Sequence, residues 1–263
     1  MPSASFTGTF DVAELAFYAF VLFFLGLVYY LRREDKREGY PLDSDRSDGG
    51  GRVTVRGFPN PPGPKKFILY HEPPNLLARR ERDLDGILAP AENWPGAPFV
   101  PLGDPMKDGV GAASYAERAE VPDVTFDEQL PKIVPLRVAK GYYLAAEDPD
   151  PRGMEVVGAD GVVAGTVSDV WIDRSETICH FLEVEVAPFL GAQRATVLVP
   201  IRLVRIDAAR RRVTVKSVLA HQIAAAPGTK DPEQITFREE DRISGYYAGG
   251  HVYATPKRTE PLL

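Results

Sequence analysis

The longest apolar run of the chain extends from Val12 to Leu31 and reads VAELAFYAFVLFFLGLVYYL, twenty residues with Glu14 as the only charge. At about 1.5 Å rise per residue, a helix of this length is about 30 Å long and crosses the hydrocarbon core of a bilayer. A core helix of a water-soluble protein normally shows a polar stripe, but residues 16–28 show none. The pattern therefore predicts a transmembrane helix over residues 12–31.

The charges on either side of this run predict its orientation. Residues 1–11 contain no Lys or Arg, so the basic start of a cleaved signal peptide is missing. The run is followed at once by four basic residues, Arg32, Arg33, Lys36 and Arg37. By the positive-inside rule, the N-terminus lies outside the cytoplasm and everything after Leu31 lies inside it. We expect Tyr29, Tyr30, Arg32 and Arg33 to meet the lipid headgroups.

From Ile133 onward, short segments rich in β-branched residues predict strands. These segments cover residues 133–138, 161–173, 178–186, 195–201 and 211–218, and residues 204–213 read as strand, turn and strand. The alternation within residues 178–186 predicts one face on a core and the other on water or a partner. The core-facing set is Leu182, Val184 and Val186, and the opposite set is Phe181, Glu183 and Glu185. So many strands predict a small, strongly bent sheet or barrel.

Residues 239–250, EEDRISGYYAGG, predict one short helix near the C-terminus. Acidic residues suit its first turn, and the glycine pair suits its end.

The region between the membrane helix and the strands is rich in proline. Many of the 24 prolines fall between Pro41 and Pro105. This predicts extended segments that hold their shape only by lying on another surface, with one strand at Phe67–Tyr70. The predicted division is therefore an external N-terminus (1–11), a transmembrane helix (12–31), an extended membrane-surface or linker region (32–105) and a β-rich cytoplasmic domain with a C-terminal tail (106–263).

The composition limits the classes of function that the protein can have. The net charge of −6 argues against a general nucleic-acid binder, which needs a basic face, and suits the handling of protons or cations. Cys179 is the only cysteine, so there is no internal disulfide, in agreement with a reducing compartment.

The sequence offers no catalytic constellation. The four histidines, His71, His180, His221 and His251, lack the short spacings of a metal site. Gly109-Val110-Gly111 follows no predicted strand, so we interpret it as a turn rather than a dinucleotide-binding loop. The chain is therefore not expected to be an enzyme.

Seven blocks of sequence resemble the H subunit of the purple-bacterial photosynthetic reaction centre. They are residues 30–42, 103–111, 114–123, 131–139, 148–176, 181–186 and 246–258, in the family's order over nearly the whole chain. The resemblance implies a single membrane helix and a mainly-β cytoplasmic domain with the PRC-barrel fold. It also implies a non-pigment-binding subunit in the bacterial inner membrane, with its N-terminus in the periplasm, capping the L and M subunits and stabilising the quinone sites.

The resemblance further implies that no cofactor is bound chiefly by this chain. Bacteriochlorophyll, bacteriopheophytin, quinones and non-haem iron would be held by partner subunits. A cytochrome subunit and the core light-harvesting antenna are further candidate partners, together with membrane lipids, but not nucleic acid.

Five carboxylates fall within seventeen residues: Asp169, Asp173, Glu176, Glu183 and Glu185. Composition alone favours an ordinary solvated face. The resemblance changes this for two of them, because Glu176 matches the family glutamate near the secondary-quinone pocket and Asp173 matches an acid of the same cluster. Carboxylates that are packed together and desolvated hold and release protons near neutral pH, so both are expected to relay protons to the quinone.

Two positions differ from the family pattern. Some relatives carry histidines at the surface entry point before the lysine that corresponds to Lys132, whereas this chain has Asp127 and Glu128 as candidates for that role. His180 stands where relatives have arginine, and adds a titratable group.

Two other hypotheses compete with this one. A membrane-anchored PRC-barrel adaptor would account for the helix and the barrel, but not for the juxtamembrane and proline-rich matches. A membrane-anchored enzyme would need a catalytic site that the sequence does not display.

Overall fold

The computed structural model describes residues 11–40, 42–43, 54–63, 65–68, 75–77, 84, 86–93, 97–192 and 194–259. Apart from Asp11, the predicted external N-terminus lies outside the described residues. The chain forms two compact units, Met1–Glu81 with Ala91–Pro98, and Arg82–Pro90 with Phe99–Leu263. We describe each unit by itself.

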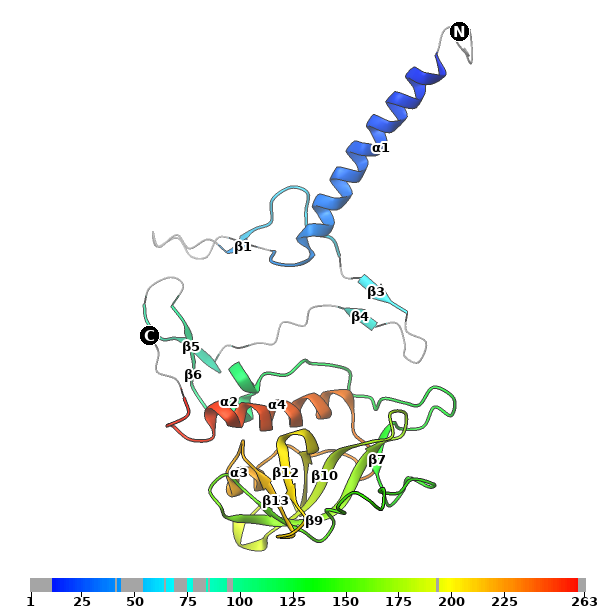
Figure 1. The fold of residues 1–263 in the computed structure, drawn as a ribbon. Coiled ribbons are helices and arrows are strands. Elements are labelled where there is room, and N and C mark those ends of the chain that lie inside the picture. Colours follow the sequence, from blue (N-terminus) through cyan, green and yellow to red (C-terminus); the bar gives the residue numbers. More distant parts are fainter. Residues whose placement is uncertain are drawn as a thin grey trace. The chain divides into compact units, whose positions relative to one another are not determined.

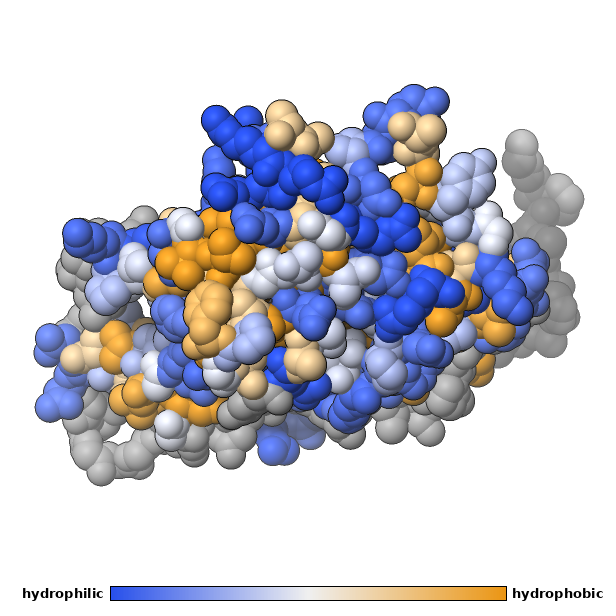
Figure 2. All heavy atoms as spheres, turned by 90° about the horizontal axis from the view of Figure 1, so that it is seen from below, coloured by the Kyte–Doolittle hydropathy of each residue, from blue (hydrophilic) through white to orange (hydrophobic). Residues whose placement is uncertain are grey.

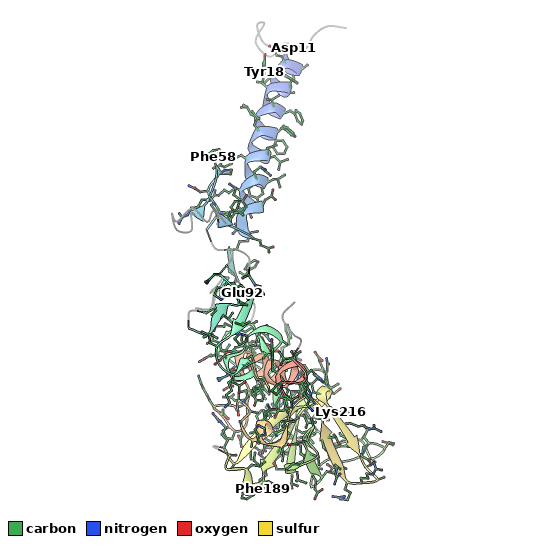
Figure 3. All side chains as sticks on the ribbon, turned by 90° about the vertical axis from the view of Figure 1, so that its left-hand side faces the viewer. Asp11, Tyr18, Phe58, Glu92, Phe189 and Lys216 are labelled. Carbon is green, nitrogen blue, oxygen red and sulfur yellow. The ribbon has the colours of Figure 1, made fainter. Side chains whose placement is uncertain are left out.

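The first unit contains the long apolar helix α1 (Val12–Glu34), as predicted. Asp11 caps it by accepting a hydrogen bond from the backbone N–H of Ala13 at 3.0 Å. The ribbon in Figure 1 shows α1 as one long, continuous helix. None of its residues is buried, and its side chains project along its whole length (Figure 3). By length and composition, α1 is the one helix among the described residues that is able to cross a membrane.

The chain just after α1 is held by two basic side chains. In the turn η1 (Asp35–Arg37), Lys36 is buried and donates from Nζ to the carbonyls of Arg56 (3.2 Å) and Pro59 (2.8 Å). Arg37 donates to the carbonyl of Gly63 at 2.7 Å. Part of the proline-rich segment therefore lies against the end of the helix, because two cations satisfy its carbonyl groups.

The described residues between η1 and α2 form three short antiparallel ladders, in agreement with the extended segments predicted there. They pair β1 (Leu42–Asp43) with β2 (Thr54–Val55), β3 (Lys65–Phe67) with β4 (Asn75–Leu77), and β5 (Leu88–Pro90) with β6 (Phe99–Pro101). The strand predicted at Phe67–Tyr70 overlaps the observed β3 only at Phe67, and residues 69 and 70 lie outside the described residues.

The second unit is built on a seven-stranded sheet in the order β11-β10-β9-β8-β13-β12, with β7 paired to β9. Its strands are β7 (Ile133–Pro135), β8 (Glu155–Val157), β9 (Val163–Asp173), β10 (Ile178–Val186), β11 (Thr196–Pro200), β12 (Val204–Asp207) and β13 (Arg212–Val215). Its helical elements are α2 (Pro105–Asp108), η2 (Gly111–Ala113), η3 (Pro188–Leu190), η4 (Ile201–Leu203), α3 (Ala220–Ala224) and α4 (Phe237–Tyr253). All pairs are antiparallel except β8 with β13. The sheet curls beneath α4 (Figure 1), and the predicted bent sheet is confirmed.

The core of this unit corrects one prediction for β10. Leu182, Val184 and Val186 are buried, as expected. Phe181 was expected on the outer face but is fully buried. The adjacent Leu182 is fully buried as well, so β10 is covered on both faces at this point, next to a β-bulge between Cys179 and Phe181. The face of the molecule in Figure 2 is mostly hydrophilic, with its apolar side chains in separate small areas, as is usual for a surface in water.

Helix α4 is longer than predicted, and its glycine pair does not end it. Thr236 and Glu239 form a capping box at its start, and the helix continues through Gly249 and Gly250 to Tyr253. A Cβ at Gly249 would lie 2.4 Å from that of Ala113, and one at Gly250 would lie 2.3 Å from Cγ1 of Val218. The pair therefore permits close packing of α4 rather than terminating it.

Gly249→Val is expected to lower the free energy of unfolding by about 1–3 kcal/mol, because its side chain overlaps Ala113 in η2. Thermal and denaturant unfolding of the full chain in detergent measures the change. The matched control is Ala248→Val at the neighbouring exposed position, which is expected to cost about 0.5 kcal/mol. Equal costs for both variants would contradict the packing role of Gly249.

Candidate functional site

The hairpin turn between β9 and β10 presents the two carboxylates that the sequence singled out. Asp173 is the last residue of β9, and its Oδ1 accepts the backbone N–H groups of Ser175 (2.8 Å) and Glu176 (2.9 Å). Thr177 closes the turn with a φ of +54°. Asp favours such turns because its short side chain bonds the backbone two or three residues ahead. The turn therefore fixes Glu176 relative to Asp173.

Lys132 joins these carboxylates to a third. Its Nζ lies 3.4 Å from Asp173, 3.5 Å from Asp123 and 3.8 Å from Glu176. The backbone sets this position, because Arg174 N–H donates to the carbonyl of Lys132 at 2.9 Å. We call Lys132, Asp123, Asp173 and Glu176 the Lys132 cluster.

The members of the Lys132 cluster differ in their contact with water. Asp173 is buried, with its side chain 4% exposed, whereas the side chain of Glu176 is 61% exposed. Burial lowers the pKa of Lys132, but the nearby charges, that of Asp173 first, outweigh this and leave the pKa above its ordinary value. The cluster therefore contains a permanent cation and three carboxylates, arranged from the solvent to the interior.

Asp127 and Glu128 lie outside the Lys132 cluster, on an exposed loop. The loop is closed by a backbone hydrogen bond from Thr125 N–H to the Leu130 carbonyl at 2.8 Å. Both acids line a cleft of about 870 Å³ that is also lined by Arg174 and Ser175 of the β9–β10 turn. The cleft thus connects the predicted entry loop with the turn that carries Asp173 and Glu176.

The side chain of His180 contacts α4 rather than the Lys132 cluster. Its Nε2 lies 3.2 Å from Oε1 of Glu240 in α4, and its ring stacks on Phe181 with centroids 4.9 Å apart. Its Nδ1 is buried and has no hydrogen-bond partner among the described residues. His180 therefore links β10 to α4 and is not a member of the Lys132 cluster.

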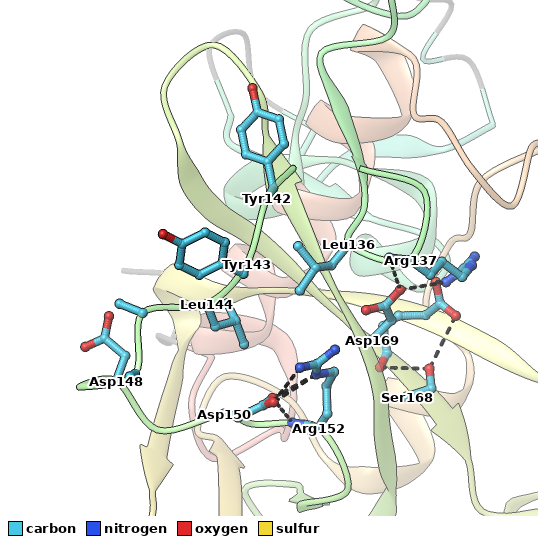
Figure 4. A pocket seen from close by; sticks show the side chains of 13 residues that line it. Leu136, Arg137, Tyr142, Tyr143, Leu144, Asp148, Asp150, Arg152, Ser168 and Asp169 are labelled. Carbon is cyan, nitrogen blue, oxygen red and sulfur yellow. Dashed lines mark hydrogen bonds and ion pairs between the residues drawn. The ribbon is translucent and has the colours of Figure 1, made fainter. Parts of the chain in front are cut away.

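The remaining carboxylates of the predicted group divide between a second cluster and the surface. Arg137 lies 3.1 Å from Asp169 (Figure 4) and 2.9 Å from Glu183. Trp171 Nε1 donates to Glu183 at 2.8 Å. Burial lowers the pKa of Arg137, but the interactions with Glu183 and then Asp169 raise it by more. The pKa of Arg137 therefore lies above its ordinary value. Glu185 is exposed. Four of the five predicted acids therefore belong to two separate clusters, each with its own cation, and the fifth, Glu185, is exposed to solvent.

Lys132 and Arg137, the two cations that organise these clusters, were not among the predicted site residues. Lys132 lies 41 and 44 residues before Asp173 and Glu176, and Arg137 lies 32 and 46 residues before Asp169 and Glu183. The signal available in the sequence was their position on either side of the segment that forms β7. A strand that pairs with β9 brings its flanking residues beside Asp173 and Asp169.

The predicted membrane-interface residues lie together at the end of α1. Tyr29, Tyr30, Arg32 and Arg33 are all exposed, and the Tyr29 ring lies 6.1 Å from that of Phe58. Within the described part of the chain, no group of three or more His, Cys, Asp or Glu residues is suited to a metal ion.

Comparison with known families gives two matches. A family model described as the photosynthetic reaction centre H-chain N-terminal region matches residues 4–138, more than half of the chain. The PRC-barrel domain matches residues 145–222, which contain β8 to β13 and the Asp173–Glu176 turn. The H chain is a non-catalytic subunit that does not itself bind pigments, so the enzyme hypothesis is wrong. The chain belongs to the photosynthetic reaction-centre H-chain family, with one apolar N-terminal helix followed by a PRC-barrel domain.

Proposed function

We propose that this chain caps the cytoplasmic side of the L and M subunits in the bacterial inner membrane, stabilises the quinone sites and conducts protons to the secondary quinone. The observation that carries the proposal is the Lys132 cluster, with a buried and an exposed carboxylate on one fixed turn. Two-electron reduction of a quinone consumes two protons, and a proton crosses a low-dielectric interior only along titratable groups and waters.

The charge balance of the Lys132 cluster suits this role. Three carboxylates face one ammonium group, so the uptake of a proton reduces an excess of negative charge. Glu176 is exposed and exchanges protons readily with water or with a partner subunit, while Asp173 is buried and held by two backbone N–H groups. In this proposal, Glu176 is the mobile proton carrier, and Asp173 with Lys132 fixes its position and charge.

Asp127 and Glu128 are the proposed entry to this path. They lie on an exposed loop and share a cleft with Arg174 and Ser175, so water in that cleft would connect them to the β9–β10 turn. His180 belongs to the proposal as a separate titratable group, paired with Glu240. Its protonation would turn the contact with Glu240 into an ion pair between β10 and α4.

The proposed orientation places the N-terminus in the periplasm, and Tyr29, Tyr30, Arg32 and Arg33 among cytoplasmic-side lipid headgroups. Bacteriochlorophyll, bacteriopheophytin, quinones and non-haem iron are proposed to lie on partner subunits. The core antenna and a cytochrome subunit are proposed as further neighbours. The adaptor alternative is less favoured, because the H-chain match covers the membrane helix and the proline-rich segment as well.

Glu176→Gln is expected to slow the proton-coupled second electron transfer to the secondary quinone, on the order of tenfold or more, while initial charge separation stays intact. The substitution preserves the shape of the side chain but removes its titratable proton. Flash absorption spectroscopy with a pH indicator measures both steps. Glu185→Gln, which removes an exposed carboxylate of β10 outside the cluster, is the control. Unchanged proton uptake in Glu176→Gln would refute the relay.

Lys132→Met is expected to lower the free energy of unfolding by about 2 kcal/mol at neutral pH, because Asp173 stays buried without its cation. The raised pKa of Lys132 means that its stabilisation is present below its unfolded pKa, about 10.4, and is lost as the pH rises through the folded value. Denaturant unfolding of the wild type should show this alkaline loss, and Lys132→Met should not. Lys140→Met, at an exposed position, is the control. Identical pH profiles for wild type and Lys132→Met would contradict the charge role.

Deletion of residues 1–31 is expected to reduce the yield of assembled complex, because packing of the membrane helix supplies part of the docking surface. The yield is measured as pigment absorbance per cell after detergent extraction. Replacing residues 12–31 by a Leu/Ala span of equal length separates anchoring from specific packing, since it restores only the anchor. A normal yield from the truncated gene would argue against any role of α1 in assembly.

A further inference from the structure

A hollow of about 520 Å³ in the β-rich unit is lined by basic side chains from four separate elements. They are Lys107 of α2, Arg194 between β10 and β11, His221 of α3 and Arg242 of α4. None of the described residues that line the hollow is an Asp or a Glu. In a chain with a net charge of −6, such a gathering of positive charge creates a local field that attracts anions.

The nearby carboxylates do not cancel this charge. Asp104 lies 3.9 Å from Nζ of Lys107 and partly neutralises that residue. Arg194 and Arg242 make no ion pair with a carboxylate in the described part of the chain, so they supply most of the positive field. Two guanidinium groups suit an oxyanion, since each presents several N–H donors in a planar fork.

The position of Arg194 is set by the backbone beside it. Its Nη1 donates to the carbonyl of Thr229 at 3.0 Å. A Cβ at Gly228 would lie 2.8 Å from Cδ and 2.9 Å from Nη1 of Arg194. The glycine thus makes room for the guanidinium, and the single hydrogen bond orients it while leaving its other donors for a ligand.

The other side chains that line the hollow are mostly apolar. Met106, Ala224, Ala226 and Tyr246 are buried in its lining, and the Tyr246 hydroxyl is already used in a hydrogen bond to the Gln222 carbonyl at 2.8 Å. The volume lies within the range of pockets for small organic molecules, and most of the surface that this hollow exposes is polar. The hollow therefore has room for more than a bare inorganic anion.

We propose that this hollow binds the phosphate group of a small phosphorylated molecule or of a lipid headgroup, with Arg194 and Arg242 as its ligands. A phosphate offers several charged oxygens, and two arginines from different elements bind it from two directions. The site is separate from the proton path, because none of its lining residues belongs to the Lys132 cluster.

Calorimetric titration with inorganic phosphate tests the site in the intact pigment-containing complex, in zwitterionic-lipid nanodiscs at constant ionic strength. Saturable binding to the wild type is expected. The double variant Arg194→Gln/Arg242→Gln should weaken it by about tenfold or more, equivalent to about 1.4 kcal/mol. Gly228→Ala should also weaken it, because it displaces Arg194 without removing a charge. Arg205→Gln, at an exposed position of β12 outside the hollow, is the control and should bind as the wild type.

A second arm separates the two sources of phosphate. If a lipid headgroup is the natural occupant, phosphatidylglycerol in the nanodiscs will compete with inorganic phosphate for the hollow. If a soluble molecule is the natural occupant, phosphatidylglycerol will not compete. Unchanged pigment spectra and flash-induced proton uptake in the variants show that any lost binding is local, and keep this test independent of the proposed proton path. The proposal is overturned if the wild type shows no saturable binding, or if Arg205→Gln weakens binding as much as the double variant.

Discussion

The attraction between the Lys132 ammonium group and the Asp173 carboxylate, 3.4 Å apart, is the interaction on which the functional end of the sheet depends. Asp173 ends β9, bonds the backbone of the following turn and lies beside the strand that follows Lys132. A carboxylate as buried as this one is tolerated only with a cation and several hydrogen bonds. The same contacts therefore satisfy a buried charge, close a hairpin and hold Glu176 at the surface.

A second basic residue, beyond the other end of β7, also pairs with two acids. Arg137 follows β7 and binds Asp169 and Glu183, which lie on β9 and β10. The two clusters bracket the pairing of β7 with β9, so electrostatic and backbone interactions support the same register. The segment that precedes the PRC-barrel match thus supplies one cation to each of two groups of acids on the sheet.

The sequence was sufficient to predict the elements whose signals are local. The apolar run predicted α1, and segments rich in β-branched residues predicted six of the seven strands of the sheet to within a few residues. Strand β8 (Glu155–Val157) was not predicted, because three residues are too few to show an alternation. Phe181 was expected to face water or a partner but is buried, because β10 is covered on both faces there and alternation alone does not show what covers the second face. The glycine pair of α4 was misread for a related reason, since glycine serves equally at a helix end and at a close helix contact.

The site was predicted only in part, because its cations are tertiary features. Glu176 and Asp173 were identified by family resemblance, and the structure brings them together with Lys132. The sequence from Lys132 to Arg137 does not predict which acids these two basic residues contact, because the contacts depend on the pairing of β7 with β9. His180 was expected near the acids, but the bulge places it beside Glu240.

The buried ammonium group of Lys36 carries one more implication. Topology rules count every lysine near a membrane helix as a charge offered to the cytoplasm or to lipid phosphates. Here, the Lys36 ammonium group donates hydrogen bonds to the carbonyl oxygens of residues 56 and 59. It therefore connects the end of the helix to the segment that follows it. Lys36 and Arg37 together therefore set the direction in which the chain leaves α1, and a neutral residue at position 36 would remove two of their three hydrogen bonds to this segment.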